Sequence, residues 1–118
     1  MSSKLDQWPW PDDLDGPVAA PDVHKVLVEN DRVRMVETII RVGETTPVHT
    51  HRLPTASYVI SGSAFIRRDE HGTVLLDTSK LDSPFVMPPA LWSDFLPAHS
   101  LENTGSEDLI VIGVELKD

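Results

Sequence analysis

From residue 24 onward, short apolar runs rich in Val, Ile and Thr alternate with turn residues every eight to twelve positions. No window of a dozen residues keeps an apolar face at helical spacing without a turn signal inside it, so the pattern predicts strands and no long helix. The expected strands span residues 24–30, 33–42, 47–51, 56–61, 63–68, 73–78, 84–88, 91–96, 99–103 and 108–116. Short strands with tight connections predict an all-β fold, either a sandwich or a small barrel.

The first 22 residues lack this pattern. They contain four prolines and Gly16, with neither helical nor strand periodicity. We therefore expect an extended, irregular N-terminal arm over residues 1–22 and a β-barrel domain over residues 23–118. Trp8 and Trp10 are the side chains able to anchor the arm. The arm either covers a neighbouring subunit, closes one end of a cavity, or is a loosely packed tail.

The composition argues against some classes of partner and gives an expected location in the cell. The 118 residues suffice for one core, and the formal net charge of −9 offers no basic stripe for nucleic acid. No apolar run is long enough to cross a bilayer and no secretory signal is recognisable, so we expect no membrane partner and a cytoplasmic location. Without cysteine, any metal must be held by histidine, carboxylate or weaker oxygen donors.

His49 and His51 stand one residue apart in the expected strand 47–51. Alternate residues of a strand face the same side, so the two imidazoles project together. They can bind one cation if another strand supplies further ligands. His99, at the start of the expected strand 99–103, is the candidate for that role. His24 and His71 are interpreted as exposed and are left out of the site.

The stretch GETTPVHTHRLPTASYVISG, residues 43–62, resembles the first motif of the cupins. In that motif a glycine is followed after five residues by His-x-His, then after three by a glutamate and after six by a glycine. The stretch HSLENTG, residues 99–105, resembles the end of the second cupin motif, a histidine followed after three residues by an asparagine. The resemblance covers about residues 24–117. It implies a small single-domain cupin with a double-stranded β-helix, or jelly-roll barrel.

Two positions depart from the cupin motifs. Thr55 stands where cupins place the glutamate, and the Pro-x-Gly of the second motif falls on Asp94 and Leu96. The resemblance therefore implies a divalent metal held by three histidines, without a carboxylate as fourth ligand; these are His49, His51 and His99. Neutral ligands leave the cation its full charge and open positions. Such sites resemble those of the iron-dependent thiol, gentisate and diketone dioxygenases.

Two functions fit these features. The first is a metal-dependent, dioxygenase-like oxidoreductase acting on a small molecule, with Fe(II) at the histidines; Zn, Ni or Mn would also suit the ligands. The second is a non-catalytic module that binds or senses a small molecule, with a weak or empty metal site. No residue is assigned as catalytic. The arm and the exposed sheet edges predict a homodimer.

Several other residues are candidates for a pocket. Trp92 and Phe95 precede His99 and either wall a pocket or fill the mouth of the barrel. Arg67, beside Arg68, either meets a substrate carboxylate or ends a solvated hairpin. Two more assignments follow from position along the chain: Tyr58 belongs to the core, on the face opposite Thr55, and Asp94 is the only acidic residue near the expected site.

Overall fold

The computed structural model describes residues 8–117, and within them the fold is all-β. The strands are β1 (His24–Glu29), β2 (Val33–Ile40), β3 (His49–His51), β4 (Thr55–Ser61), β5 (Phe65–Asp69), β6 (Val74–Asp77), β7 (Ala90–Ser93), β8 (Leu96–Asn103) and β9 (Leu109–Leu116). The helical pieces are short: η2 (Asp12–Leu14), α1 (Gly16–Ala19) and η3 (Thr78–Lys80). The prediction of short strands without a long helix is confirmed for this part of the chain.

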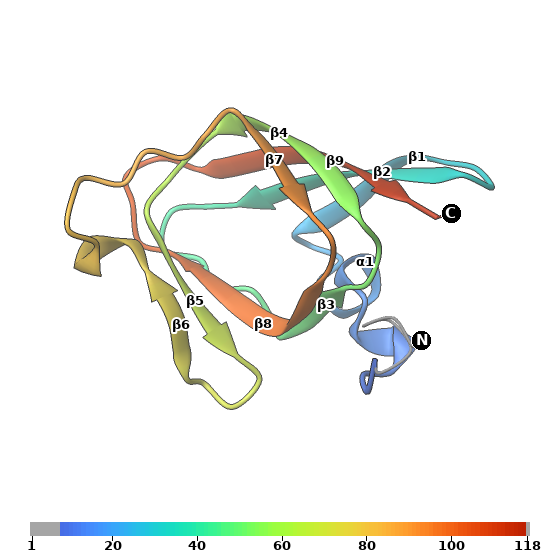
Figure 1. Ribbon diagram of the computed structural model, residues 1–118, viewed down its shortest axis with the longest axis horizontal. Helices are drawn as coiled ribbons and strands as arrows, with labels where there is room; N and C mark the ends of the chain where they lie inside the picture. The colour runs from blue at the N-terminus through green and yellow to red at the C-terminus, as the bar shows by residue number, and fades with distance from the viewer. Residues whose placement is uncertain (1–7, 118) are drawn as a thin grey trace.

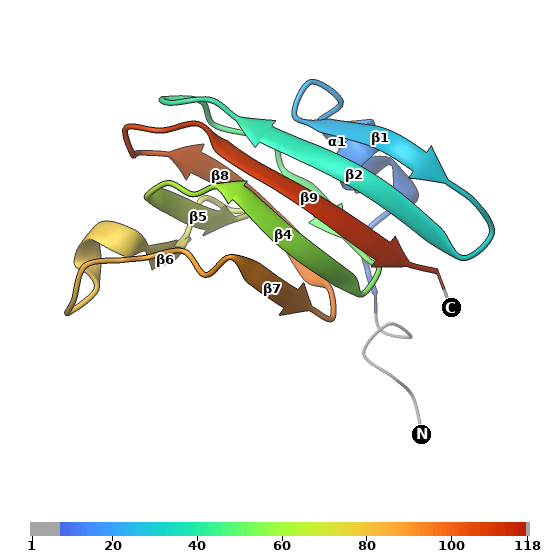
Figure 2. The ribbon, with the colours of Figure 1, turned by 90° about the horizontal axis from the view of Figure 1, so that it is seen from above.

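The strands form two antiparallel sheets that face each other (Figure 1). One sheet has the order β1-β2-β9-β4-β7, and these strands lie side by side in Figure 2. The other has the order β3-β8-β5-β6. Over residues 8–117 no strand of one sheet pairs with a strand of the other, so hydrogen bonds do not close the jelly roll into a continuous barrel.

Three segments differ from the sequence-based expectation. Residues 84–88 form no strand, because Pro84 and Pro88 lack the backbone N–H that a ladder needs. The expected strands 91–96 and 99–103 are instead β7 and a longer β8 that passes through Pro97, which sits near the strand's start where the missing donor costs least. The arm is not irregular throughout, since residues 12–19 form η2 and α1.

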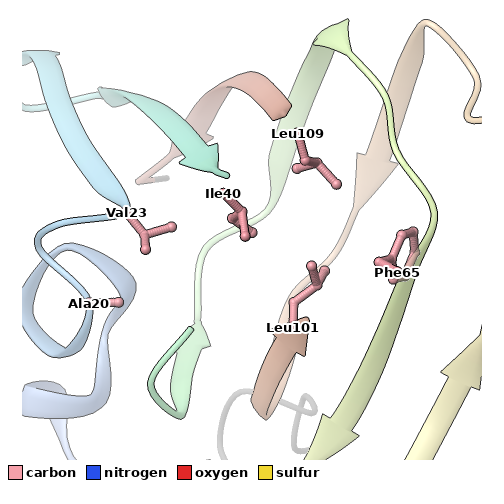
Figure 3. Close-up of a cluster of buried hydrophobic side chains, with 6 residues drawn as sticks. All are labelled: Ala20, Val23, Ile40, Phe65, Leu101 and Leu109. Carbon is pink, nitrogen blue, oxygen red and sulfur yellow. The ribbon is translucent and has the colours of Figure 1, made fainter. Parts of the chain in front are cut away.

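The core lies between the sheets (Figure 3), where apolar side chains from both sheets and from the segment before β1 meet: Ala20, Val23, Ile40, Phe65, Leu101 and Leu109. β4 shows the alternation that builds this interior, because Thr55 and Ser57 face inward while Tyr58 faces outward. Tyr58 is 61% exposed, so its assignment to the core is wrong. It does point away from Thr55, but no second layer covers that face in the described chain.

Asn103, at the end of β8, ties the turns at one end of the sandwich together. Its side chain is 1% exposed and makes four hydrogen bonds. The amide nitrogen donates to the carbonyls of Ile40 and Glu107, each at 2.9 Å. The amide oxygen accepts from the Ser63 hydroxyl at 2.6 Å and from the Gly105 N–H at 3.0 Å. A buried polar group with all its partners stabilises one arrangement of these turns.

We predict that Asn103→Ala lowers the free energy of unfolding by about 2–4 kcal/mol, because it leaves buried donors and acceptors unpaired. Urea unfolding followed by circular dichroism measures the change. Asn30→Ala is the matched control: the Asn30 amide oxygen likewise accepts two hydrogen bonds, both from backbone N–H groups, but it lies at the surface. This substitution should cost less than about 1 kcal/mol. Equal losses in the two variants would contradict the role given to Asn103.

Candidate metal centre

The pairing of β3 with β8 brings the histidines of the two cupin-like motifs together. His49 lies directly opposite His99 in the antiparallel register, and their ring centroids are 4.4 Å apart. The His51 ring lies 4.9 Å from that of His49 and 5.5 Å from that of His99. The three imidazoles expected to act together therefore share one place in the fold.

His24 joins this group, which corrects its interpretation as exposed. It is 4% exposed, and its ring lies 4.7 Å from that of His49 and 5.1 Å from that of His51. The ligand atoms of His24, His49 and His51 all lie within 4.8 Å of one another. His24 faces inward because it pairs across the sheet with Thr38, which lines the interior. His71, by contrast, is exposed as expected, with 81% of its side chain accessible.

Backbone carbonyls orient three of the four rings. The Nδ1 atom of His49 lies 2.8 Å from the Pro47 carbonyl oxygen, and that of His99 lies 2.7 Å from the Pro97 carbonyl oxygen. His24 Nδ1 lies 3.2 Å from the Ala20 carbonyl oxygen. A carbonyl only accepts, so each Nδ1 carries the proton. The Nε2 lone pair is then free, which is the arrangement that metal-binding histidines use.

The N-terminal segment packs onto these rings from its own chain. A Cβ atom added to Gly16, the first residue of α1, would lie 2.9 Å from His51 Cε1 and 3.4 Å from His24 Cδ2. Only glycine leaves room for both imidazoles at this contact. Trp8 and Trp10 hold the segment down. Trp8 packs edge-on against Phe95 at 5.6 Å, and Trp10 donates a 3.1 Å hydrogen bond to Glu70. Residues 8–22 thus close the end of the fold that holds the histidines.

Burial keeps the histidines neutral. It lowers the pKa of His24 to about 4 and that of His99 to about 3, and the charge that His49 would carry acts in the same direction. Burial also lowers the pKa of His49. The pKa of His51 lies well below its usual value, first because of burial and then because the charges that His49, His24 and His99 would carry act in the same direction. Neutral imidazoles can donate their lone pairs to a metal without first losing a proton.

A cavity of about 400 Å³ opens between the sheets beside the histidines. This volume falls within the range of small-molecule sites, roughly 300–1,000 Å³. Most of its lining is apolar, with residues from both sheets, among them Val36, Ile40, Phe65, Met87, Leu91, Leu96, Leu101, Leu109 and Val111. The interior therefore suits a ligand with an apolar body and few polar groups.

Of the other candidate pocket residues, Thr55, Arg67 and Trp92 line the cavity, whereas Phe95 lies outside its lining. Thr55 lines the cavity, but its hydroxyl donates to the Leu53 carbonyl at 3.0 Å. Arg67 and Trp92 also line it, and Trp92 is 57% exposed, so it forms part of the rim. Phe95 does not appear in the lining formed by the described residues and lies against Trp8.

Glu115 is the acidic residue of the cavity, and no motif pointed to it. It is 3% exposed and lies opposite Thr55 in the pairing of β4 with β9. Arg34 binds its carboxylate and also forms a 2.8 Å ion pair with Asp15. Asp94, expected to be the only acidic residue near the site, instead accepts from the Trp92 indole at 2.9 Å. The sequence does contain one signal for Glu115. It lies at period-two spacing from Leu109, Val111 and Gly113, which places it on the buried face of the last strand.

Comparison with known proteins identifies the fold. No family model and no curated protein matches the sequence. The structure matches a cupin domain from Bordetella pertussis Tohama I with a TM-score of 0.62 and 15% identity, over 81% of this chain and 93% of that one. It matches an RmlC-like cupin with a double-stranded β-helix fold from Methanocaldococcus jannaschii with a TM-score of 0.55 and 16% identity, over 80% and 78%. The polyketide cyclase RemF from Streptomyces resistomycificus matches with a TM-score of 0.51 and 18% identity, over 80% and 64%.

These similarities show that the protein is a small domain with the cupin fold, in agreement with the resemblance of its motifs. The histidine cluster fits a metal-binding cupin. Among the described residues, no helix is long and apolar enough to cross a membrane.

We predict that the metal-free protein loses stability as the pH falls from 7 to about 4. The folded chain keeps imidazoles such as His24 neutral down to a pKa of about 4, whereas the unfolded chain protonates them near 6.5. The unfolded state therefore binds more protons in this window, and acid favours unfolding.

The comparison variant is His24→Gln, with urea unfolding measured at each pH. At about 1.4 kcal/mol per pKa unit, the fall in unfolding free energy should shrink by up to about 3 kcal/mol in this variant. His71→Gln should leave the fall unchanged, because His71 is exposed in the folded state as well. Profiles that coincide for wild type and His24→Gln would show that His24 is not held neutral by the fold.

Proposed function

We propose that the protein binds one divalent metal ion through His49, His51 and His99, with His24 as a fourth donor, and that the ion serves a small molecule held in the cavity. The observation that carries this proposal is the convergence of four neutral imidazoles beside the cavity, of which those of His24, His49 and His99 are buried and that of His51 is half-buried. In His49 and His99 the Nδ1 atom is hydrogen-bonded to a carbonyl, which leaves Nε2 available as a ligand atom.

His24 supplies what Thr55 cannot. The Thr55 hydroxyl donates to its own backbone and carries no charge, so the position where cupins place a glutamate contributes no ligand. His24 comes from β1, outside both motifs, and its ligand atom lies within 4.8 Å of those of His49 and His51. The donor set is then all imidazole, which suits Fe, Zn and Ni more than it suits Mn, Ca or Mg.

A site made only of histidines affects the chemistry that a bound metal ion could perform. A bound divalent ion would act as a Lewis acid with its full charge, and would keep coordination positions for a ligand. The chain itself supplies a mostly apolar cavity that opens between the sheets, with Ser57, Ser93 and Thr38 as neutral polar groups on its wall. Apolar walls around a metal limit its contact with water, and this suits a dioxygenase-like reaction.

The second candidate is a non-catalytic cupin that binds or senses a small molecule. It is favoured because the described lining of the cavity holds no acidic side chain free to act as a base, since Arg34 binds the Glu115 carboxylate. One neighbour in fold, RemF, is a polyketide cyclase, so turnover without oxygen is a third outcome to examine. Oxygen uptake by the iron-loaded protein with thiols, diketones and dihydroxy aromatics supports the first candidate. Ligand-dependent stabilisation without turnover supports the second.

We predict near-stoichiometric metal in protein purified without chelators or loaded with Fe(II), Zn, Ni or Mn, as measured by elemental analysis. The double variant His49→Ala, His51→Ala should bind less than about a tenth as much, because it removes the adjacent pair of donors. His24→Ala should bind at least about tenfold more weakly if His24 is a ligand. His71→Ala is the control and should bind as wild type does. No metal in the wild-type protein after loading would overturn the proposal.

We also propose that the protein forms a homodimer over the outer face of β4 and β7. Tyr58, Ile60 and Trp92 are each more than half exposed there, at 61%, 57% and 57%. The neighbouring Ala56 and Ala90 are small and uncharged. Over a chain with net charge −9, an uncharged apolar face is where two copies approach with least repulsion.

Sedimentation velocity at micromolar concentration should therefore give a dimer for the wild-type protein. Tyr58→Glu combined with Ile60→Glu should give a monomer, because the contact would bury like charges from both copies. The control is Val18→Lys, which changes an exposed residue of α1 away from this face. A monomeric wild-type protein would refute the dimer.

A further inference from the structure

Arg67 places a positive charge inside the cavity, near the histidines. It lies on β5 opposite Leu101, and its side chain lines the cavity with those of Leu101 and His99. His99 is two residues from Leu101 on β8, so Arg67 and His99 are diagonal neighbours across the sheet. Such pairs lie about 7–8 Å apart and are within reach of a long side chain. The Arg67 charge contributes to the lowered pKa of both His49 and His99, in accord with this placement.

The guanidinium of Arg67 has no anionic partner among residues 8–117. Its Nε atom is buried and forms no hydrogen bond within that part of the chain. Its Cζ atom lies 5.6 Å from the centroid of the Phe65 ring, which is an uncharged neighbour. Burial lowers the pKa of Arg67. A charged group is costly to bury without a partner, so this position is unfavourable unless something else occupies the cavity.

The other arginines near the site are paired, which makes Arg67 the exception. Arg68, its neighbour in sequence, binds Glu102 at 3.0 Å on the other side of β5. Arg34 binds Glu115 and Asp15. The carboxylate of Glu115, which also lines the cavity, is thus already neutralised by Arg34. Among the described residues that line the cavity, Arg67 carries the one positive charge that no side chain of residues 8–117 balances.

We propose that Arg67 binds the carboxylate of a small organic acid whose apolar body fills the cavity. A guanidinium binds a carboxylate through two parallel hydrogen bonds donated by its N–H groups. The apolar lining suits a hydrocarbon or aromatic body, and it disfavours inorganic phosphate, which would lose its hydration without gaining polar partners. The carboxylate site at Arg67 is independent of the proposed function. Contact between the far end of the acid and a metal at the histidines rests on that function.

The test uses benzoate as the probe and benzamide as its neutral counterpart of the same shape, with binding measured by titration calorimetry. Both the chelator-treated and the zinc-loaded protein are titrated. Benzoate should bind both forms at least tenfold more tightly than benzamide. Arg67→Met should abolish this preference in both forms, while Arg68→Met, which removes the paired arginine, should leave it intact.

A second measurement keeps the result interpretable if the substitution perturbs folding. Without ligand, Arg67→Met should unfold at a higher temperature than wild type, since it removes an unpaired buried charge. A lower unfolding temperature would show that Arg67 is structural and would overturn the proposal. Arg67→Lys keeps the charge but loses the fork, so benzoate should bind it at least fivefold more weakly than it binds wild type.

Three other outcomes would also overturn the carboxylate site. Benzoate affinity within twofold of wild type in Arg67→Met is the first. Binding only to the zinc-loaded form, unaffected by Arg67→Met, would assign the carboxylate to the metal. Inorganic phosphate binding as tightly as benzoate would indicate an unselective anion site. If elemental analysis finds no metal but benzoate binding still depends on Arg67, the metal proposal fails and the carboxylate site stands.

Discussion

The antiparallel pairing of β3 with β8 is the constraint on which the site depends. It sets His49 opposite His99, and the two-residue period of β3 adds His51 to the same face. The rings of His49 and His99 are then held by carbonyls two residues earlier in the chain, that of Pro47 just before β3 and that of Pro97 within β8. A proline carbonyl accepts as any other does, and a proline has no N–H of its own to satisfy. The group that orients each of these imidazoles is therefore fixed by the same stretch of chain that carries it.

The second determinant of the site is how the charges of its buried side chains are balanced. Four imidazoles stay neutral because burial disfavours their protonated form. Arg34 is neutralised by two carboxylates, and one of these, Glu115, would otherwise be a free anion in the cavity. Arg34, Arg67, Glu115 and Asp15 together carry no net charge, so the unbalanced positive charge is local to Arg67, which has no acidic partner among the described residues. A bound divalent ion would add positive charge beside it. An anionic ligand is the complement that these groups require.

The carboxylate that cupins carry in the first motif has a counterpart one strand away. Glu115 lies opposite Thr55 in the β4–β9 pairing, but its oxygen is taken by Arg34. Arg34 in turn bonds to Asp15 in the N-terminal segment, next to Gly16, which packs on His51 and His24. The N-terminal segment thus acts on the site in two ways. It covers the rings of His51 and His24, and its Asp15 binds Arg34, which pairs with the Glu115 carboxylate. Its contacts with the histidines come from the same chain, without a second subunit.

The sequence by itself determined the elements and part of the site. Strand periodicity and turn residues predicted the all-β fold, and the two-residue spacing predicted that His49 and His51 share a face, because both are local features. The resemblance to the second cupin motif brought in His99. Only the tertiary structure decided the rest. His24 and Glu115 enter the site through the pairing of β1 with β2 and of β4 with β9, which no local pattern encodes. Tyr58 was assigned to the wrong environment because alternation tells which side chains share a face, but not whether another layer covers that face. The buried, unpaired state of Arg67 likewise depends on which carboxylates lie near it, and the packing of the two sheets decides that.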